Sequence, residues 1–205
     1  MPKYTILPRM AQYPRVPTAI MASPSAADLA QALPLDGGLW AVDIETRGVE
    51  AHSPDSAIVG IGFANVEAVY YVDLRNLQPD AELYLKRFLL QSRLSAFNVG
   101  FDGTFLQVYT GQWLNWTDCS YGLAKQMSGE GFRGQSWSLD TMITDVLGWN
   151  VNTKAVMAAV LKERGMTKAT MWQLPAEIIG PYCASDADAA WQLRGVLYDV
   201  LERLP

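Results

Sequence analysis

The stretch that decides the fold is LWAVDIETRG at residues 39–48. Apart from Asp43, its first six residues are apolar, a composition typical of a buried β-strand. Asp43 and Glu45 are separated by one residue, so the alternation of a strand turns both carboxylates to one face while Ile44 points to the other. Acids gathered at the edge of a packed core are unstable unless cations hold them. The sequence therefore predicts a site for hard divalent metal ions at this strand end.

Short apolar segments and amphipathic segments alternate after this strand, which predicts an α/β fold. Two further strands separated by a tight polar turn complete a β-meander with the first. The predicted elements, in chain order, are strands at 57–64 and 68–74, a helix at 81–92, a strand at 95–99, a helix at 101–110 and a fifth strand at 113–119.

The carboxy-terminal half is predicted to be mostly helical. Three glycines in residues 128–135 predict a mobile surface loop there, and Pro181 suits the start of the last helix. The helices expected in this half cover residues 121–127, 136–148, 152–165 and about 182–204.

The amino-terminal 38 residues are rich in proline and alanine, with one short helix candidate at 25–33. We interpret residues 1–17 as a Pro-rich, extended N-terminal arm and residues 18–205 as one domain, because 205 residues fit a single large core.

Composition narrows the functional classes. With 50% hydrophobic and 18% charged residues, and without an apolar run of about 20 residues or a signal core, the chain is expected to be a soluble, cytoplasmic protein with no membrane association. Cys119 and Cys183 are far apart and are expected to be buried free thiols. His52 is the sole histidine, which excludes a His-rich metal site. A bound metal would therefore have oxygen ligands.

Two more acids could lie near Asp43 and Glu45. Asp102 begins a helix directly after a predicted strand, and Asp186 lies in the first turns of the last helix. Helix amino termini soften the repulsion between clustered acids. Taken singly, each of these two aspartates is by default a helix-capping acid.

The order of the acids along the chain and the residues that flank them resemble a known family. VDIET, then Asn98, Phe101 and Asp102 in NVGFD, then Tyr182 and Asp186 in YCASD, resemble the three exonuclease motifs of the DnaQ-like (DEDD) superfamily. Tyrosine four residues before the last aspartate resembles the tyrosine branch (DEDDy). The resemblance spans roughly residues 18–203 and is closest to the 3′–5′ proofreading domain of bacterial and phage family A DNA polymerases. Phe97 stands where many relatives carry histidine, a departure at a position that is not a metal ligand.

Membership in that superfamily implies a ribonuclease H-like fold with a mixed five-stranded sheet flanked by helices. It also implies hydrolysis with two Mg²⁺ (or Mn²⁺) ions, which suit oxygen ligands. In that reading Asp43 bridges both ions, Glu45 and Asp186 complete one site, and Asp102 holds the second ion mainly through water. Tyr182 is expected to orient the attacking water, since an unperturbed phenol titrates near ~10.

Substrate contacts are also carried over from the resemblance. Thr46 and Val49 match the stretch that touches the terminal nucleotide, and Asn98 and Phe101 are candidate sugar or base contacts. Other polar residues are predicted to have lesser roles. Scattered charges usually form a solvated face, although four cations could contact phosphates, namely Lys125, Arg133, Lys154 and Lys162. Asp118 and Asp140 are predicted to be structural caps, and Asp188 a structural or supporting charge.

The predicted function is a metal-dependent 3′–5′ exonuclease that acts on the 3′ end of single-stranded or frayed DNA, as a free-standing, phage-encoded proofreading subunit or an excised domain. If the source is a phage, the location is the host cytoplasm, and a separate DNA polymerase is the candidate partner. A net charge of −5 argues against non-specific adhesion to duplex DNA. The alternatives are RNA trimming like ribonuclease D, with the same carboxylates, and a non-catalytic polymerase-docking or nucleic-acid-binding module.

Overall fold

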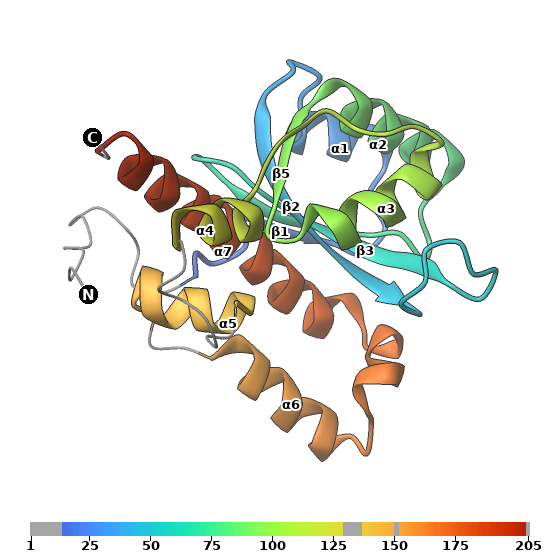
Figure 1. Ribbon diagram of the computed structural model, residues 1–205. Coiled ribbons are helices and arrows are strands. Elements are labelled where there is room, and N and C mark those ends of the chain that lie inside the picture. The colour runs from blue at the N-terminus through green and yellow to red at the C-terminus, as the bar shows by residue number, and fades with distance from the viewer. Residues whose placement is uncertain (1–13, 129–136, 150–151, 204–205) are drawn as a thin grey trace.

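The computed structural model describes residues 14–128, 137–149 and 152–203. A six-stranded mixed sheet forms its centre (Figure 1). The strands lie in the order β1-β4-β3-β2-β5-β6. Their bounds are β1 Ala19–Met21, β2 Leu39–Arg47, β3 Ala57–Ala64, β4 Val69–Asp73, β5 Arg93–Ala96 and β6 Trp116–Cys119. The antiparallel strands β2, β3 and β4 form the predicted meander, and β1, β5 and β6 each pair in parallel with a neighbour. This is the ribonuclease H-like architecture that the sequence predicted.

The sheet has one strand more than predicted. β1 covers the edge of β4, with Ala19 opposite Tyr70 and Met21 opposite Val72. It has only three residues, too few for alternation to be visible in the sequence, and its partner lies about 50 residues away along the chain. Covering the edge of β4 removes a row of unpaired backbone groups.

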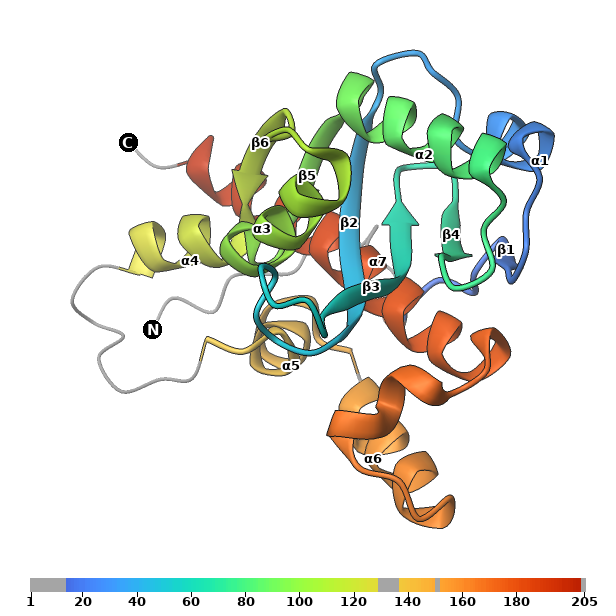
Figure 2. The same ribbon diagram turned by 90° about the vertical axis from the view of Figure 1, so that its right-hand side faces the viewer.

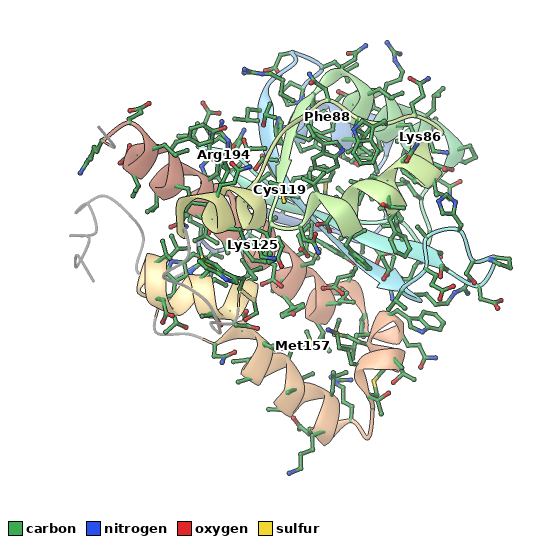
Figure 3. All side chains as sticks on the ribbon, in the orientation of Figure 1. Lys86, Phe88, Cys119, Lys125, Met157 and Arg194 are labelled. Carbon is green, nitrogen blue, oxygen red and sulfur yellow. The ribbon has the colours of Figure 1, made fainter. Side chains whose placement is uncertain are left out.

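Helices cover both faces of the sheet (Figure 2). Apolar side chains that alternate with the acids, such as Val42 and Ile44, pack into a core with α1 (Ala26–Ala32), α2 (Pro79–Gln91) and α3 (Val99–Thr110). The opposite face is covered by α7 (Ala176–Leu201), joined by α6 (Thr153–Glu163) and the 3-10 helix η3 (Lys168–Gln173). Met157 of α6 belongs to this second core (Figure 3).

Three further helical segments complete this second layer. α4 (Ser120–Ser128), α5 (Leu139–Met142) and the π-helical segment η2 (Ile143–Leu147) contribute to a third apolar cluster with the carboxy-terminal half of α7. The sequence predicted helices for all of these segments but not the 3-10 helix at 168–173. Of the predicted loop at 128–135, only Ser128 is described, and it ends α4.

The last helix begins earlier than predicted. It starts at Ala176, with Pro175 at its N-cap, so that Pro181 lies inside the helix and not at its start. A proline in a helix interior removes one backbone hydrogen bond and normally costs ~3 kcal/mol. Ala176, Ile179 and Gly180 are buried before it, which indicates that apolar packing onto the sheet offsets this cost.

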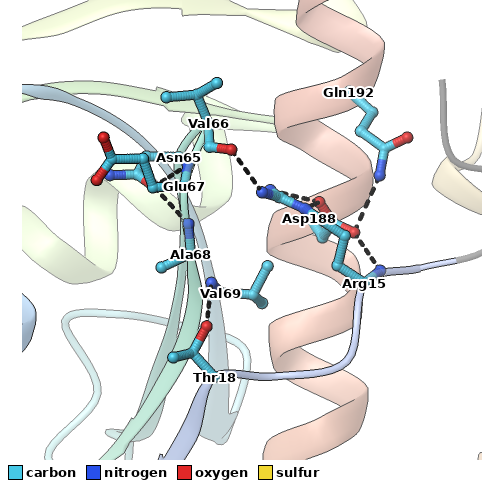
Figure 4. A network of polar contacts seen from close by, with 9 residues as sticks. All are labelled: Arg15, Thr18, Asn65, Val66, Glu67, Ala68, Val69, Asp188 and Gln192. Atoms are coloured by element: carbon cyan, nitrogen blue, oxygen red, sulfur yellow. Dashed lines mark hydrogen bonds and ion pairs between the residues drawn. The ribbon is translucent and has the colours of Figure 1, made fainter. Parts of the chain in front are cut away.

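The segment before β1 is attached to α7 through a buried charge (Figure 4). Asp188 has no exposed surface, and its carboxylate accepts hydrogen bonds from the backbone and side chain of Arg15 at 2.7 and 2.8 Å. Gln192 donates a third hydrogen bond to it at 3.0 Å. Arg15 therefore contacts the domain although it precedes the predicted boundary at residue 18, which stays a prediction. Residues 1–13 of the predicted arm lie outside the described residues.

The two cysteines differ in burial. Both are free thiols; Cys183 is fully buried, whereas Cys119 is half-buried, so the prediction of a buried thiol is wrong for Cys119, which sits at the end of the edge strand β6. None of the helices in the described part of the chain combines the length and the apolarity that crossing a bilayer requires.

Candidate active site

The carboxyl end of β2 supplies the first two acids of the candidate site. Asp43 lies opposite Gly62 and Glu45 opposite Gly60 in the ladder with β3, and the register then shifts before Thr46. Alternation places both carboxylates on the face that α7 covers. Asp43 is half-buried and Glu45 retains only 8% exposure. The strand thus presents two acids beneath a helix.

Glycines on β3 let α7 come close to these acids. A Cβ added at Gly62 would lie 2.6 Å from the carbonyl oxygen of Cys183, closer than real atoms approach. At Gly60 the corresponding space is filled by the ring of Tyr71. The Cys183 thiol lies 3.5 Å from the backbone oxygen of Asp43. Helix and sheet are therefore in contact at the level of the strand acids.

Tyr182 and Asp186 are one turn apart on α7, which places them on the same side of the helix. Asp186 is half-buried and accepts hydrogen bonds from Tyr182 and from Thr153 at the start of α6. Its charge interacts with those of Asp43 and Glu45. The last helix thus brings a third acid to the strand end.

Asp102 reaches the same place from the other layer. β5 runs parallel to β2, with Ala96 opposite Val42, so both strands end at the same edge of the sheet. α3 begins at Val99 just after β5, which puts Asp102 in its first turn with 5% exposure. Backbone hydrogen bonds at Asp102, Asn98 and Ile44 favour its charged form. Asp102 also interacts electrostatically with Asp43, Glu45 and Asp186.

All four acids have raised pKa values. Burial is the largest cause for each, followed for Asp43 and Glu45 by the charge of Asp186. The charge of Asp186 also contributes to the rise at Asp102, while Asp140 contributes to the rise at Asp186. The pKa of Asp43 lies well above its ordinary value, and that of Glu45 is raised to about 8. The pKa values of Asp102 and Asp186 are each raised to about 7. Such a cluster is strongly disposed to bind cations, which would relieve both the burial cost and the repulsion.

The donor atoms fit hard divalent ions. One carboxylate oxygen of Asp43, one of Glu45 and the Cys183 sulfur lie within 4.8 Å of one another. Carboxylate oxygens suit Mg²⁺ and Mn²⁺. The Cys183 pKa is raised well above its ordinary value by burial and by the neighbouring acids, which keeps this thiol protonated. A protonated thiol is a poor ligand, so oxygen donors dominate the site.

Tyr182 is held in its neutral form. Burial and then the charges of Asp186, Glu45 and Asp43 raise the pKa of its phenol far above the ordinary value. A phenol that keeps its proton can donate and accept hydrogen bonds but does not act as a base near neutral pH.

The predicted substrate contacts differ in their exposure. Thr46 is half-buried, and its hydroxyl donates a hydrogen bond to the Gly48 carbonyl at 2.7 Å. Val49 lies two residues beyond the end of β2 and is 78% exposed. Asn98 is exposed and is the N-cap of α3, although its side chain makes no capping hydrogen bond. Phe101 is half-buried, with its ring centroid 5.0 Å from that of Phe105.

The predicted structural charges are paired rather than capping. Asp118 accepts hydrogen bonds from Ser95 and, at 2.6 Å, from Arg194 of α7. Asp140 pairs with Lys154 at 3.0 Å, and Ser138 caps that helix instead. The expectation that either aspartate is a helix cap is therefore wrong, because each has a cationic partner that is distant in sequence.

The remaining candidates are at the surface. His52 is exposed in the turns after β2. Lys125 lies over the Tyr121 ring, 4.3 Å from its centroid, and Lys162 is exposed in the last turn of α6. Arg133 lies outside the described residues.

Several interactions with the acids were not predicted from the sequence. Thr153 bonds Asp186, and the charge of Lys154 also acts on Asp186. The charge of Lys168 acts on Glu45 from η3. Their segment offers only a helical pattern and scattered polar residues, so the sequence carried no signal for these contacts.

Comparison with known proteins places the chain in a protein family. The family model of the 3′–5′ exonuclease domain of the DNA polymerase A type matches residues 21–202. No curated protein sequence gives a significant match.

Three solved structures illustrate the similarity in fold. Brucella melitensis NrnC with bound Mg²⁺ has 19% identity and a TM-score of 0.58, covering 83% of this chain and 79% of its own. Trypanosoma brucei RNase D in complex with GMP is 18% identical, with a TM-score of 0.63. The match covers 84% of this chain and 55% of the RNase D chain. The POL domain of Pol1 from M. smegmatis, in complex with DNA primer-template and dNTP, is 17% identical, with a TM-score of 0.58. The match covers 87% of this chain and 26% of the Pol1 chain.

Proposed function

Because this chain belongs to the 3′–5′ exonuclease family, we propose that it removes nucleotides one at a time from the 3′ end of single-stranded or frayed DNA. The observation that carries this proposal is the convergence of Asp43, Glu45, Asp102 and Asp186. They come from β2, α3 and α7, and each carries a raised pKa in the presence of the others. A merely structural set of acids would be paired with cations one by one, as Asp118 and Asp140 are.

The acids would hold two Mg²⁺ or Mn²⁺ ions, with Asp43 at the centre because it interacts with all three of the others. The chemistry that such ions supply when bound is stabilisation of the charge on the attacking, leaving and non-bridging oxygens of a phosphodiester. The acids themselves do not need to exchange protons. Packing between β2 and α7 fixes the carboxylates in place, and bound cations would offset the raised pKa values and keep the acids charged.

Tyr182 is assigned the orientation of the attacking water. Its phenol is neutral and already hydrogen-bonded to Asp186, so its hydroxyl is fixed beside the acids. Thr153, at the start of α6, also interacts with Asp186. A residue held in this way contributes through position and not through proton removal.

Support for DNA as substrate comes from the family model, which describes the exonuclease of polymerase A type. We propose that proofreading with a separate DNA polymerase is the biological role. RNA trimming is the second candidate, favoured by the fold likeness to RNase D, a protein whose structure was solved with GMP. The chemistry at the acids is the same in both cases.

The experiment that tests the proposal follows the shortening of single strands labelled at the 5′ end, with Mg²⁺ and with chelator. Matched DNA and RNA oligonucleotides of one sequence are compared, and a strand with a blocked 3′ end controls for direction. We expect stepwise loss from the 3′ end, dependent on metal and faster on DNA. Faster loss on RNA would replace the DNA assignment by RNA trimming.

Two variants separate catalysis from binding. Asp43→Ala and Asp102→Ala are expected to abolish digestion while leaving the circular dichroism spectrum unchanged. Undiminished digestion in either variant would reject the assignment. Metal-independent strand binding without any digestion by the wild type would instead indicate a non-catalytic nucleic-acid-binding module.

A further inference from the structure

Arg47 is the last residue of β2, two positions beyond Glu45, and is exposed. Its Nε donates a hydrogen bond to the carbonyl oxygen of Asp55 at 2.6 Å. Its guanidinium lies over the ring of Trp172, 5.6 Å from the centroid. These two contacts fix the plane of the group. In the described part of the chain, Nη1 and Nη2 have no hydrogen-bond partner, and they are the pair of donors that matches a phosphate.

Lys168 adds a second cation on the same side. It is the first residue of η3, the short helix that also carries Trp172, and it is exposed. Its charge acts on Glu45, which places it beside the candidate active site. β2 and η3 are in contact, so the two cations belong to one region of the surface.

Neither of these cations forms an ion pair with a carboxylate in the described part of the chain. Other cations close to the sheet and α7 have carboxylate partners: Arg75 pairs with Asp73, and Arg194 with Asp118. Lys154, which lies near Asp186, pairs with Asp140. Arg47 and Lys168 are therefore available to an external anion.

The substrate requires such cations. The chain has a net charge of −5, and the acids at the end of β2 would repel an approaching polyanion. Affinity for a nucleic-acid strand comes mainly from phosphate contacts. Local positive charge next to the acids is needed to hold the strand while its last phosphodiester lies at the acids.

We propose that Arg47 and Lys168 form a phosphate-binding subsite for the sugar–phosphate backbone of a single strand, adjacent to the scissile phosphate. Trp172 is a positioning residue that holds the guanidinium plane of Arg47. This inference rests on the proposed function, because the acids beside the subsite define which phosphate is cleaved.

The test measures binding separately from hydrolysis. A labelled 12-nucleotide single strand is titrated with protein in Mg²⁺, in an Asp43→Asn background, and fluorescence anisotropy gives Kd. Arg47→Gln and Lys168→Gln are each expected to raise Kd about 10-fold, as loss of a charge-assisted hydrogen bond predicts. Each should also reduce the slope of log K against log salt by ~0.7. Arg87→Gln removes an exposed arginine from α2, in the other layer, and is the matched control expected to leave Kd unchanged.

Conservative variants distinguish phosphate recognition from a change in fold. Arg47→Lys keeps the charge but not the paired donors, so it should restore the salt slope and only part of the affinity. Trp172→Phe keeps an aromatic face and should retain more affinity than Trp172→Ala, with melting temperatures recorded for both.

The outcomes separate the two proposals. Equal Kd values for Arg47→Gln, Lys168→Gln and Arg87→Gln would overturn the subsite, whether or not the wild type digests DNA. A wild type that digests no strand, combined with weaker binding by the two glutamine variants, would contradict the proposed function and leave the subsite standing.

Discussion

Gly62 lies directly opposite Asp43 in the ladder between β2 and β3. A Cβ at position 62 would be 2.6 Å from the carbonyl oxygen of Cys183 and 3.2 Å from the Cα of Ala184, both backbone atoms of α7. The missing side chain therefore sets how closely α7 approaches the strand. The same helix carries Tyr182 and Asp186, so this glycine also sets the distance between the acids of the strand and those of the helix.

Gly62→Ala is expected to displace α7 and to reduce activity more than stability. Overpacking against backbone atoms costs roughly 1–3 kcal/mol, while a displacement of about 1 Å at a catalytic centre costs on the order of 100-fold in rate. Chemical denaturation and digestion rates measure the two effects.

The control is Gly195→Ala on α7, where a Cβ meets no atom within 4 Å. It should raise stability by about 1 kcal/mol at wild-type activity. A Gly62→Ala enzyme with the wild-type rate would contradict this account.

The sequence was most informative where local periodicity and chemistry coincide. Alternation alone predicted that Asp43 and Glu45 share a face, and the ladder with β3 confirms it. The meander and most helices follow from apolar spacing, because each buries one face against the sheet. Convergence of Asp102 and Asp186 on the strand end could not be derived from spacing. It came from resemblance of the motifs. In the structure the placement follows from the start of α3 just after β5, which runs parallel to β2, and from the close approach of α7 to β3.

The features that the sequence did not predict depend on contacts between segments that are distant along the chain. β1 is too short to show alternation, and only its pairing with β4 stabilises it. Pro181 reads as a helix start, yet buried apolar residues before it extend the helix by more than a turn. Arg47 and Trp172 are separated by more than a hundred residues, and no local pattern links an arginine to an aromatic ring at that distance.

Tyr182→Phe tests the role of the phenol. Loss of the hydroxyl removes the hydrogen bond to Asp186 and the orientation of the water, and we expect kcat to fall by about 10–100-fold with little change in KM. Because burial and the acids raise the pKa of this phenol, its ionisation does not shape the pH profile near neutrality. Measurements of kcat between pH 6 and 9 should therefore give pH profiles of the same shape for the wild type and for Tyr182→Phe, with lower values for the variant. A Tyr182→Phe variant with unchanged kcat would remove Tyr182 from the mechanism.

The buried pair of Arg15 and Asp188 predicts that the segment before residue 18 contributes to stability. Arg15→Ala leaves Asp188 buried without its cation, and breaking such a pair costs about 3–5 kcal/mol when both partners are fully buried. Since the Arg15 side chain is 27% exposed, we expect a loss of roughly 2–3 kcal/mol. Urea denaturation measures it. Arg203→Ala breaks the exposed pair with Asp199 and should cost less than ~0.5 kcal/mol.

A double variant identifies the cause of that loss. Asp188→Asn removes the charge that Arg15 neutralises, so Arg15→Ala should cost less in an Asp188→Asn background than in the wild type. Equal costs in both backgrounds would assign the effect of Arg15 to packing of its side chain and not to the ion pair.

Stability without metal should fall as pH rises. The acids of the site ionise near their ordinary pKa values in the unfolded chain, about 3.8 for aspartate and 4.5 for glutamate. In the folded protein Asp102 and Asp186 keep their protons to about 7 and Glu45 to about 8. Between these limits the folded state binds more protons than the unfolded state. The free energy of unfolding therefore decreases with pH through a window of about 4 to 8.

Divalent metal should reverse this dependence, because it binds the ionised acids of the folded state. At a Mg²⁺ or Mn²⁺ concentration about 100-fold above Kd, stability should increase by ~2.7 kcal/mol, or roughly 5–10 °C in melting temperature. The increase should be largest above pH 8 and small near pH 5, where protons compete for the same oxygens.

Asp43→Asn removes one of the repelling charges. Without metal, this variant should therefore melt at a higher temperature than the wild type at pH 8, and it should gain less stability from Mg²⁺. Melting curves of both proteins with chelator and with metal test this, and a metal-free wild type whose melting temperature rises from pH 5 to pH 8 would show that the acids are not mutually destabilising.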